Sequence, residues 1–297
     1  MYKRQDKHSG NTIENFSVQI SDNASNELRD NHQLITNLEE TFPILQKEIL
    51  GFKNKFLIGG IGFFVIDGKC FSDFSREETI GIYNKICKAL GTLYVQNIKN
   101  EKFVVIKDEG KSMMSGGRYH QTKEGGSFHT DSPQWNKVPD FVGLCCVNPA
   151  KKGGESKFVS AYSIHNEILK EHKHFLKILY DQFHFDKRGE YRSDESPTVF
   201  EPIFTYDNNH LKLRYLRDYI NDGHKIQNMP LSKEQNGALD CLDKIIHDEN
   251  LAVSYELKQG DMIFLNNGRV LHGRTAFEDF EDIDKKRQMI RTWIKDI

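Results

Sequence analysis

Short apolar runs separated by turn residues dominate the chain from Phe56 onward. Most runs are only a few residues long and end at Gly, Asp, Asn or Pro, a pattern typical of β-strands joined by turns. The predicted strands span residues 56–58, 62–68, 103–106, 141–147, 199–206, 211–216, 252–257, 262–265 and 287–294. We expect the strands at 199–206 and 211–216 to form a hairpin.

Fewer segments carry apolar residues at helical spacing. Helices are expected near residues 34–50 and after Ser75, Ser163 and Ser232. Ser75 and Ser232 are each followed three residues later by Glu or Gln, which is a capping box at a helix start. Because strands outnumber helices, the predicted fold is mainly β with flanking helices, and specifically a double-stranded β-helix, or jelly-roll, barrel.

The pattern also suggests the domain organisation. Residues 1–30 are rich in Asn, Ser, Asp and Lys and show little apolar periodicity, so we expect a loosely ordered N-terminal segment. No internal repeat or low-complexity linker interrupts residues 31–297, which are therefore expected to form a single jelly-roll domain.

Composition argues against some binding partners and favours one cellular compartment. The 297 residues include 41 basic and 43 acidic side chains, and this balance gives no electrostatic case for nucleic acid or an anionic membrane. No apolar run is long enough for a membrane span, and the first residues lack the apolar core of a secretory signal. The five cysteines are an odd number without framework spacing, which favours the reducing cytoplasm.

The most informative stretch is Phe128-His129-Thr130-Asp131. On an extended strand, His129 and Asp131 point to the same face and Thr130 points away. Two histidines and one carboxylate form the facial triad that holds Fe(II) while leaving coordination positions open. The best candidate for the second histidine is His272, which follows Leu265–Leu271 on another predicted strand.

The last predicted strand adds a second chemical feature. Period-two alternation places Arg287, Met289, Arg291 and Trp293 on one face. A carboxylate bound bidentately to Arg287 would supply negative charge between the guanidinium groups and a divalent cation. The alternative interpretation is that both arginines are surface residues paired with the acidic loop Glu278–Asp284. This loop separates the strand from His272 and leads us to expect a hairpin.

Together these motifs resemble the taurine dioxygenase (TauD/TfdA-like) family of Fe(II)/2-oxoglutarate dioxygenases. Five blocks carry the resemblance in the family's order, namely Gly62–Gly68, Phe128–Ser132, Gly153–Ser156, Leu271–Phe277 and Arg287–Trp293. The resemblance implies that His129, Asp131 and His272 bind iron and that Arg287 binds the C5 carboxylate of 2-oxoglutarate. It also implies that Ser156, where Thr is commoner, contacts this cosubstrate.

Several residues are candidates for contact with the primary substrate, some from the resemblance and some from their place on a loop. Arg291 matches a position near the substrate in several members, and Arg118 and His120 lie on a glycine-rich loop before the H-x-D strand. Two more arginines and an acid follow a predicted strand and are either substrate-side residues or a solvated salt-bridge cluster: Arg214, Arg217 and Asp218. Arg274 is expected to be structural.

The predicted activity is hydroxylation of a small molecule with Fe(II), 2-oxoglutarate and O2. The arginine pair favours an anionic or zwitterionic substrate, such as an amino acid or a small carboxylate, sulfonate or phosphonate. No nucleic-acid or membrane partner is expected, and a homo-oligomer is left open. Two alternatives remain: a catalytically silent jelly roll that senses 2-oxoglutarate, and a zinc hydrolase that uses the same three ligands.

Overall fold

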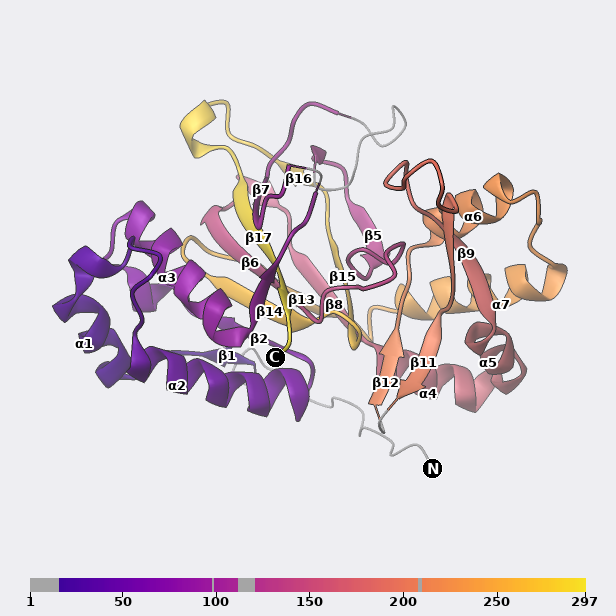
Figure 1. Cartoon of the computed structure of the whole chain (residues 1–297), viewed down its shortest axis with the longest axis horizontal. Helices are drawn as coiled ribbons and strands as arrows, with labels where there is room; N and C mark the ends of the chain where they lie inside the picture. The colour runs from indigo at the N-terminus through magenta and orange to yellow at the C-terminus, as the bar shows by residue number, and fades with distance from the viewer. Residues whose placement is uncertain (1–15, 98, 112–120, 208–209) are drawn as a thin grey trace.

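Two β-sheets form the centre of the molecule (Figure 1). The computed structural model describes residues 16–97, 99–111, 121–207 and 210–297. The larger sheet contains, in spatial order, β1 (Ser17–Val18), β2 (Phe63–Ile66), β14 (Met262–Asn266), β6 (Phe141–Asn148), β17 (Gln288–Lys295) and β3 (Thr92–Tyr94), with β4 (Phe103–Ile106) also paired to β17. The smaller sheet contains β13 (Val253–Tyr255), β8 (Ser156–Ser160), β15 (Val270–Arg274) and β5 (Gly126–His129).

Three two-stranded pairs lie outside these sheets. They are β9 (Gln182–Asp186) with β10 (Thr198–Pro202), β11 (Phe204–Asp207) with β12 (His210–Leu213), and β7 (Lys152–Gly153) with β16 (Phe277–Glu278). The predicted hairpin exists as β11–β12. Its first strand is shorter than expected, because Val199 belongs to β10 and pairs with Phe185 of β9.

The inner faces of the two sheets share an apolar core. Phe63 of β2 stacks on Phe158 of β8, with ring centroids 4.9 Å apart. Val142, Ile263 and Met289 extend this core on the larger sheet. On β2 and β14 these positions alternate with outward-facing apolar residues, so these two strands are buried on both faces.

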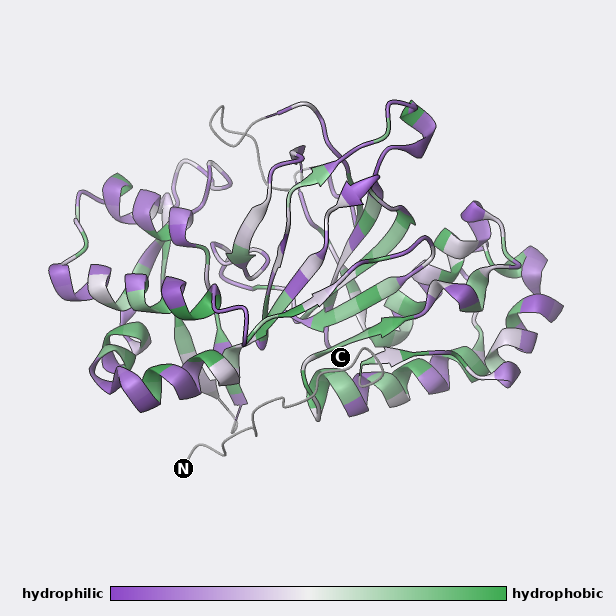
Figure 2. Ribbon diagram, turned by 180° about the vertical axis from the view of Figure 1, so that it is seen from behind, coloured by the Kyte–Doolittle hydropathy of each residue, from purple (hydrophilic) through white to green (hydrophobic). Residues whose placement is uncertain are grey.

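Helices cover the outer faces of both sheets. α1 (Asp22–Asp30), α2 (Pro43–Phe52) and α3 (Arg76–Leu90) pack against the larger sheet, and α4 (Ala161–Glu171), α5 (Lys173–Tyr180) and α7 (Lys233–Ile246) pack against the smaller one. α6 (Arg217–Ile226) packs against β9. Figure 1 shows these helices on opposite sides of the sheets, and Figure 2 shows polar residues along their outward faces. The fold is thus mainly β with flanking helices.

Local motifs explain several of the helix boundaries. The capping boxes at Ser75 and Ser232 are present and begin α3 and α7, as predicted. α4 begins earlier than expected, after Ser160 rather than Ser163. The run at 56–58 is not a strand but the end of a π-helical turn, Lys53–Ile58, that continues α2. A three-residue apolar run cannot distinguish these states, and here Arg269 donates hydrogen bonds to carbonyls at the end of that turn.

The expectation for residues 1–30 is wrong for the part that the structure describes. Ser21 caps α1, and Ala24 and Leu28, four residues apart, are fully buried against α2 and the larger sheet. Only two apolar residues contact the core from this helix, so the segment has too weak a periodicity to recognise in a polar sequence.

The predicted hairpin between His272 and the last strand is also wrong. β15 belongs to the smaller sheet and β17 to the larger one, so the two strands face each other across the interior. Among the described residues, the strands form separate sheets rather than one continuously hydrogen-bonded barrel. This arrangement places the chemistry of both strands in the space between the sheets.

Candidate active site

A cavity of about 400 Å³ opens between the two sheets. The smaller sheet contributes His129, Ser156 and His272 to its wall, and β17 with the residue before it contributes Arg287, Met289, Arg291 and Trp293. The alternation predicted for the last strand is therefore confirmed. α6 and the segment after Asp186 form the mouth of this cavity.

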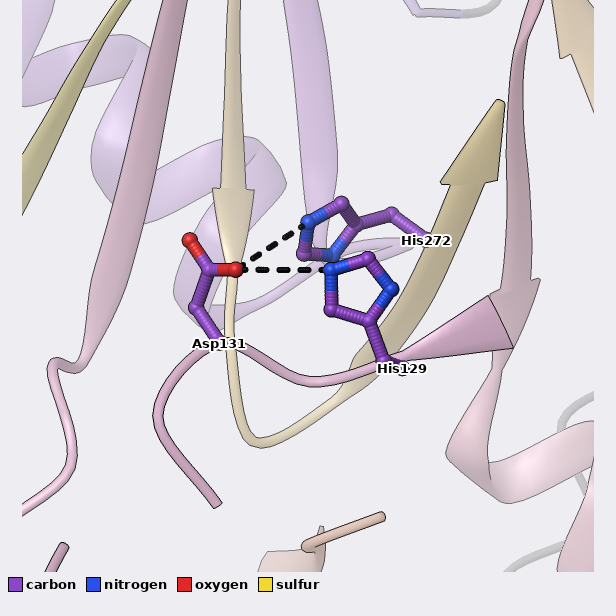
Figure 3. A group of neighbouring side chains, drawn as sticks. All are labelled: His129, Asp131 and His272. Carbon is purple, nitrogen blue, oxygen red and sulfur yellow. Dashed lines mark ion pairs between the residues drawn. The ribbon is translucent and has the colours of Figure 1, made fainter. Parts of the chain in front are cut away.

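His129, Asp131 and His272 meet inside this cavity. His129 and His272 are register partners on β5 and β15, and one potential ligand atom from each of the three residues lies within 4.8 Å of the others. Figure 3 shows both imidazoles directed at the same carboxylate oxygen. Asp131 Oδ1 is 3.5 Å from Nε2 of His129 and 3.7 Å from Nε2 of His272.

The protonation states of these residues suit a divalent metal ion. Burial, helped by repulsion from His129, lowers the pKa of His272 to about 3, so its imidazole is neutral near pH 7. Nδ1 of His129 is 2.9 Å from the carbonyl oxygen of Ser127. Because that carbonyl can only accept, Nδ1 is the donor of this contact and Nε2 is the ring nitrogen that faces Asp131. Two imidazole nitrogens and a carboxylate are donors that Fe(II) accepts.

Asp131 is held ionised by its surroundings. Burial by itself opposes ionisation, but Arg291 and the two histidines outweigh it and hold the pKa of Asp131 below its ordinary value. The second oxygen, Oδ2, accepts a hydrogen bond of 2.6 Å from Nε1 of Trp293. Nη1 of Arg291 lies 3.5 Å from the same oxygen.

Backbone contacts fix the strand that carries His129 and Asp131. Thr130, between them, exchanges hydrogen bonds with the backbone of Tyr215: its N–H donates to the Tyr215 carbonyl, and its hydroxyl accepts from the Tyr215 N–H. Asn267 accepts a hydrogen bond from the Asp131 N–H at 2.7 Å and donates one to the Asp131 carbonyl at 3.0 Å. Ser132 has a φ of 54°, an uncommon value for a residue other than glycine, so the chain turns sharply after the carboxylate.

A positively charged end of the cavity lies beside the triad. Arg287 is only 5% exposed, and its guanidinium makes no hydrogen bond or ion pair with any described residue. It packs on the ring of Phe277, 5.0 Å from the centroid. Burial lowers the pKa of Arg287 from its usual value. A buried cation without a hydrogen-bonded counter-ion is costly, so the position is suited to an anionic ligand.

Ser156 and Arg274 complete this end of the cavity. The Ser156 hydroxyl makes no hydrogen bond with the described residues. Arg274, two residues after His272, lines the same cavity, and burial, with repulsion from Arg287, lowers its pKa to about 10. Unlike Arg287, it donates hydrogen bonds to the carbonyls of Thr122 and Glu124. Arg274 therefore has the expected structural role and also lines the cavity.

The mouth of the cavity carries acidic residues from α6. Asp218 and Asp222 both line it. Arg188 forms ion pairs with two acids: its Nη1 is 2.9 Å from Asp222 and 3.3 Å from Asp186. Its guanidinium also lies over the ring of Tyr219. The mouth thus contains charges of both signs, in contrast to the arginines deeper in the cavity.

Most of the expected site residues line the cavity, whereas some of the proposed substrate contacts already bond to other parts of the chain. Arg291 lines the cavity as predicted for a substrate contact, but its guanidinium already contacts Asp131 and Gln96. Arg118 and His120 lie outside the described residues. The three residues Arg214, Arg217 and Asp218 do not form one cluster. Asp218 lines the cavity, and Arg217 pairs with Asp240 and Asp243. Arg214 donates hydrogen bonds to the carbonyls of Pro133 and Trp135.

Sequence reasoning missed the hydrogen bonds of Trp293, Asn267 and Asp222. Trp293 was placed on the correct face, but no pattern indicates which oxygen its indole reaches. No local pattern marks Asn267, because its hydrogen-bond partner Asp131 is remote in sequence. Asp222 lies on a helix whose orientation over the cavity depends on tertiary packing.

Comparison with known proteins identifies the family. Residues 57–293 match the family described as taurine catabolism dioxygenase TauD, TfdA. The chain belongs to the TauD/TfdA dioxygenase family. A relative, FR-33289 synthase of Streptomyces rubellomurinus, is 31% identical over 240 residues, which are 79% of this chain and 69% of the relative. Enzymes of the TauD/TfdA family use Fe(II), 2-oxoglutarate and O2, and this chain is a dioxygenase of that class.

Solved structures share the same fold. An asparagine oxygenase bound to Fe(II), 3-hydroxyasparagine and succinate superposes with a TM-score of 0.73 at 15% identity, covering 94% of this chain and 93% of that one. The non-haem iron oxygenase OrfP, solved with Fe and α-ketoglutaric acid, gives a TM-score of 0.66 at 12% identity, covering 94% of each chain. At these identities the likeness shows the fold alone. Within the described residues, no helix has the length and apolar character needed to cross a bilayer.

Proposed function

We propose that this TauD/TfdA-family chain hydroxylates an unactivated C–H bond of a small anionic or zwitterionic molecule, with release of succinate and CO2. One observation carries the proposal: a buried arginine without a partner opens into the same cavity as a His-Asp-His cluster. A metal site alone would fit many enzymes, whereas a metal site beside a buried guanidinium fits a cosubstrate that is both a chelator and a carboxylate.

In this proposal, His129, Asp131 and His272 hold Fe(II). Arg287 forms a bidentate ion pair with the C5 carboxylate of 2-oxoglutarate, and the Ser156 hydroxyl donates a hydrogen bond to the same group. The buried position of Arg287 strengthens this pairing, because few water molecules compete for the guanidinium.

Bound iron would supply the oxidising chemistry: substrate C–H, 2-oxoglutarate and O2 give substrate C–OH, succinate and CO2. The chain's own residues perform other tasks. The neutral imidazole of His272 and the ionised Asp131 provide donors without prior loss of a proton. Leu144, Phe158 and Met289 line the wall with apolar side chains and limit the access of water. The mouth orients the substrate.

Charge distribution supports an amino-acid-like substrate. Arg291 lines the inner wall, and Asp218 and Asp222 line the mouth, so a molecule with an anionic and a cationic group can meet both signs. Similar solved structures contain 3-hydroxyasparagine or 3-hydroxy-arginine. We keep Arg118 and His120 as proposed substrate contacts. Small carboxylates, sulfonates and phosphonates remain within this class.

The finer aspects of the fold and location are also proposals. The two facing sheets, with helices outside, support a jelly-roll arrangement in which residues 31–297 act as one domain. All five cysteines are free, which supports a reducing compartment such as the cytoplasm.

The test is O2-dependent succinate formation from 2-oxoglutarate with a panel of amino acids and small oxyanions. Wild type is expected to form succinate, whereas His272→Ala should fall to background because one ligand is lost. His174→Ala, which removes an exposed imidazole on α5, is the matched control. Equal rates in wild type and His272→Ala would refute the proposal.

Two further readouts separate the alternatives. A zinc hydrolase would keep its activity under strict anaerobiosis. A silent sensor would bind 2-oxoglutarate without converting it to succinate, either alone or with any substrate in the panel.

A further inference from the structure

The two oxygens of the Asp131 carboxylate have different environments. Oδ1 faces Nε2 of both His129 and His272 at 3.5 and 3.7 Å. Oδ2 points toward β17, where it accepts the 2.6 Å hydrogen bond from Trp293 and approaches Arg291. Figure 3 shows one carboxylate oxygen facing both imidazoles and the other turned away from them. Only one oxygen is therefore presented to the proposed metal site.

We propose that Trp293 is a positioning residue that restricts Asp131 to one-oxygen coordination of the metal. The inference rests on the proposed function of the triad. A carboxylate can bind a cation through one oxygen or through both. Three protein atoms leave three of six octahedral positions open, and a keto acid that chelates takes two of them. A second carboxylate oxygen would leave two positions for three ligand atoms, the two of the keto acid and one more, so it would compete with the chelating keto acid.

The geometry around Trp293 suits this role. The indole N–H is a donor only, so the contact with Oδ2 has one direction. The ring is buried and fixed between neighbours: Trp135 packs edge-on at 5.2 Å, and the Arg291 guanidinium lies 4.7 Å from its centroid. A rigid donor at 2.6 Å occupies Oδ2 and resists rotation of the carboxylate.

Arg291 contributes differently. Its Nε donates to Oε1 of Gln96 at 2.9 Å, and its distance of 3.5 Å to Oδ2 is long for a hydrogen bond. Arg291 therefore supplies positive charge near Asp131, whereas Trp293 supplies direction. This difference predicts that loss of the indole N–H changes how Asp131 binds the metal, even while Arg291 keeps the carboxylate ionised.

The decisive variant is Trp293→Phe, which keeps an aromatic ring and removes the N–H. Metal affinity is measured by anaerobic titration with Fe(II) or Mn(II). Chelation of 2-oxoglutarate is then measured at saturating Fe(II) from the visible charge-transfer absorption of the keto-acid complex. We expect 2-oxoglutarate chelation to weaken by about 10- to 100-fold, with a smaller change in metal affinity.

Trp135→Phe is the matched control. Trp135 is the only other tryptophan in the chain, and its indole N–H donates to Glu190 at 2.9 Å rather than to Asp131. We expect wild-type metal binding and 2-oxoglutarate chelation in this variant. A crystal structure of Mn(II)-loaded Trp293→Phe should show both Asp131 oxygens within bonding distance of the metal.

Several results would overturn the inference. Unchanged metal binding and chelation in Trp293→Phe, with only a lower melting temperature, would show that Trp293 is a packing residue. Weaker metal binding with wild-type chelation at saturating metal would show that the indole orients Asp131 without limiting its oxygens. Failure of wild type to bind metal or 2-oxoglutarate would instead refute the proposed function.

If Trp293→Phe does not fold, an isosteric replacement keeps the question open to experiment. In a Trp135→Phe background, Trp293 is the only tryptophan and can be replaced biosynthetically by benzothienylalanine, which has sulfur in place of the N–H. The same loss of chelation is expected. Wild-type chelation in this protein would exclude the role of the hydrogen bond.

Discussion

The two ends of the cavity are built from different kinds of structure. At the metal end, His129, His272 and Arg291 lie on or next to paired strands, and the backbone of Asp131 is bonded to Asn267. At the mouth, Asp222 lies on a helix and Arg188 on a loop, and their ion pair is partly exposed. The difference suggests that the metal end fixes the reaction and the mouth determines the substrate.

The largest effect that tests this comparison is expected at Arg287. Arg287→Gln should weaken 2-oxoglutarate binding by about 2–5 kcal/mol, roughly 30- to several-thousand-fold, because a buried carboxylate loses its charged partner. Anaerobic titration of the Fe(II)-loaded protein measures this change. Arg274→Gln is the control, because that guanidinium is already bonded to backbone carbonyls. Equal losses in both variants would contradict the assignment of Arg287.

A smaller effect is expected from Asn267, whose hydrogen bonds hold the backbone at Asp131 in place. Asn267→Ala removes three hydrogen bonds to the backbone of Asp131 and Pro139. We expect a stability loss of about 1–3 kcal/mol in chemical denaturation and metal affinity about 10- to 100-fold lower. Asn266→Ala serves as the neighbouring control, and a similar loss of metal affinity there would argue against a specific role for Asn267.

At the mouth, the expected effect is selective rather than large. Arg188→Ala should change the KM for the primary substrate several-fold and leave 2-oxoglutarate affinity unchanged, because Arg188 pairs with Asp186 and Asp222 and makes no contact with Arg287 among the described residues. Partly exposed pairs contribute only about 0–1 kcal/mol to stability. Arg192→Ala, on the same loop but highly exposed, is the control. A change in 2-oxoglutarate affinity would show that the two ends are coupled.

The smallest effect concerns pH and lies outside the cavity. His165 of α4 is buried and bonded to Tyr180, and burial lowers its pKa to about 4. Between this value and the ordinary value of about 6.5, the unfolded state binds more protons, so stability falls as the pH decreases through this window. In His165→Gln the decrease of the melting temperature from pH 7 to 4.5 should be less steep. An identical decrease would rule out His165 as a contributor.

The contrast between the two ends also explains how much could be predicted. The positions of His129, Asp131 and Arg287 follow from period-two alternation and from motifs that match the family. The location of Asp222 and the division of labour between Arg217 and Asp218 depend on how α6 packs on β9, which no local pattern specifies. The strand layout was largely correct, but the sheets to which β15 and β17 belong were not predictable from their proximity in sequence.

The pairing of His129 with His272 has a consequence for folding. These residues are remote in the chain, and they meet only after β5 and β15 have aligned in the correct register. A shift of one residue would turn His272 to the opposite face of its strand. Such non-local contacts form slowly, because the intervening chain must be ordered first. Metal binding therefore indicates that β5 and β15 have paired in the native register. A chain with intact helices but a shifted strand would fail to bind metal.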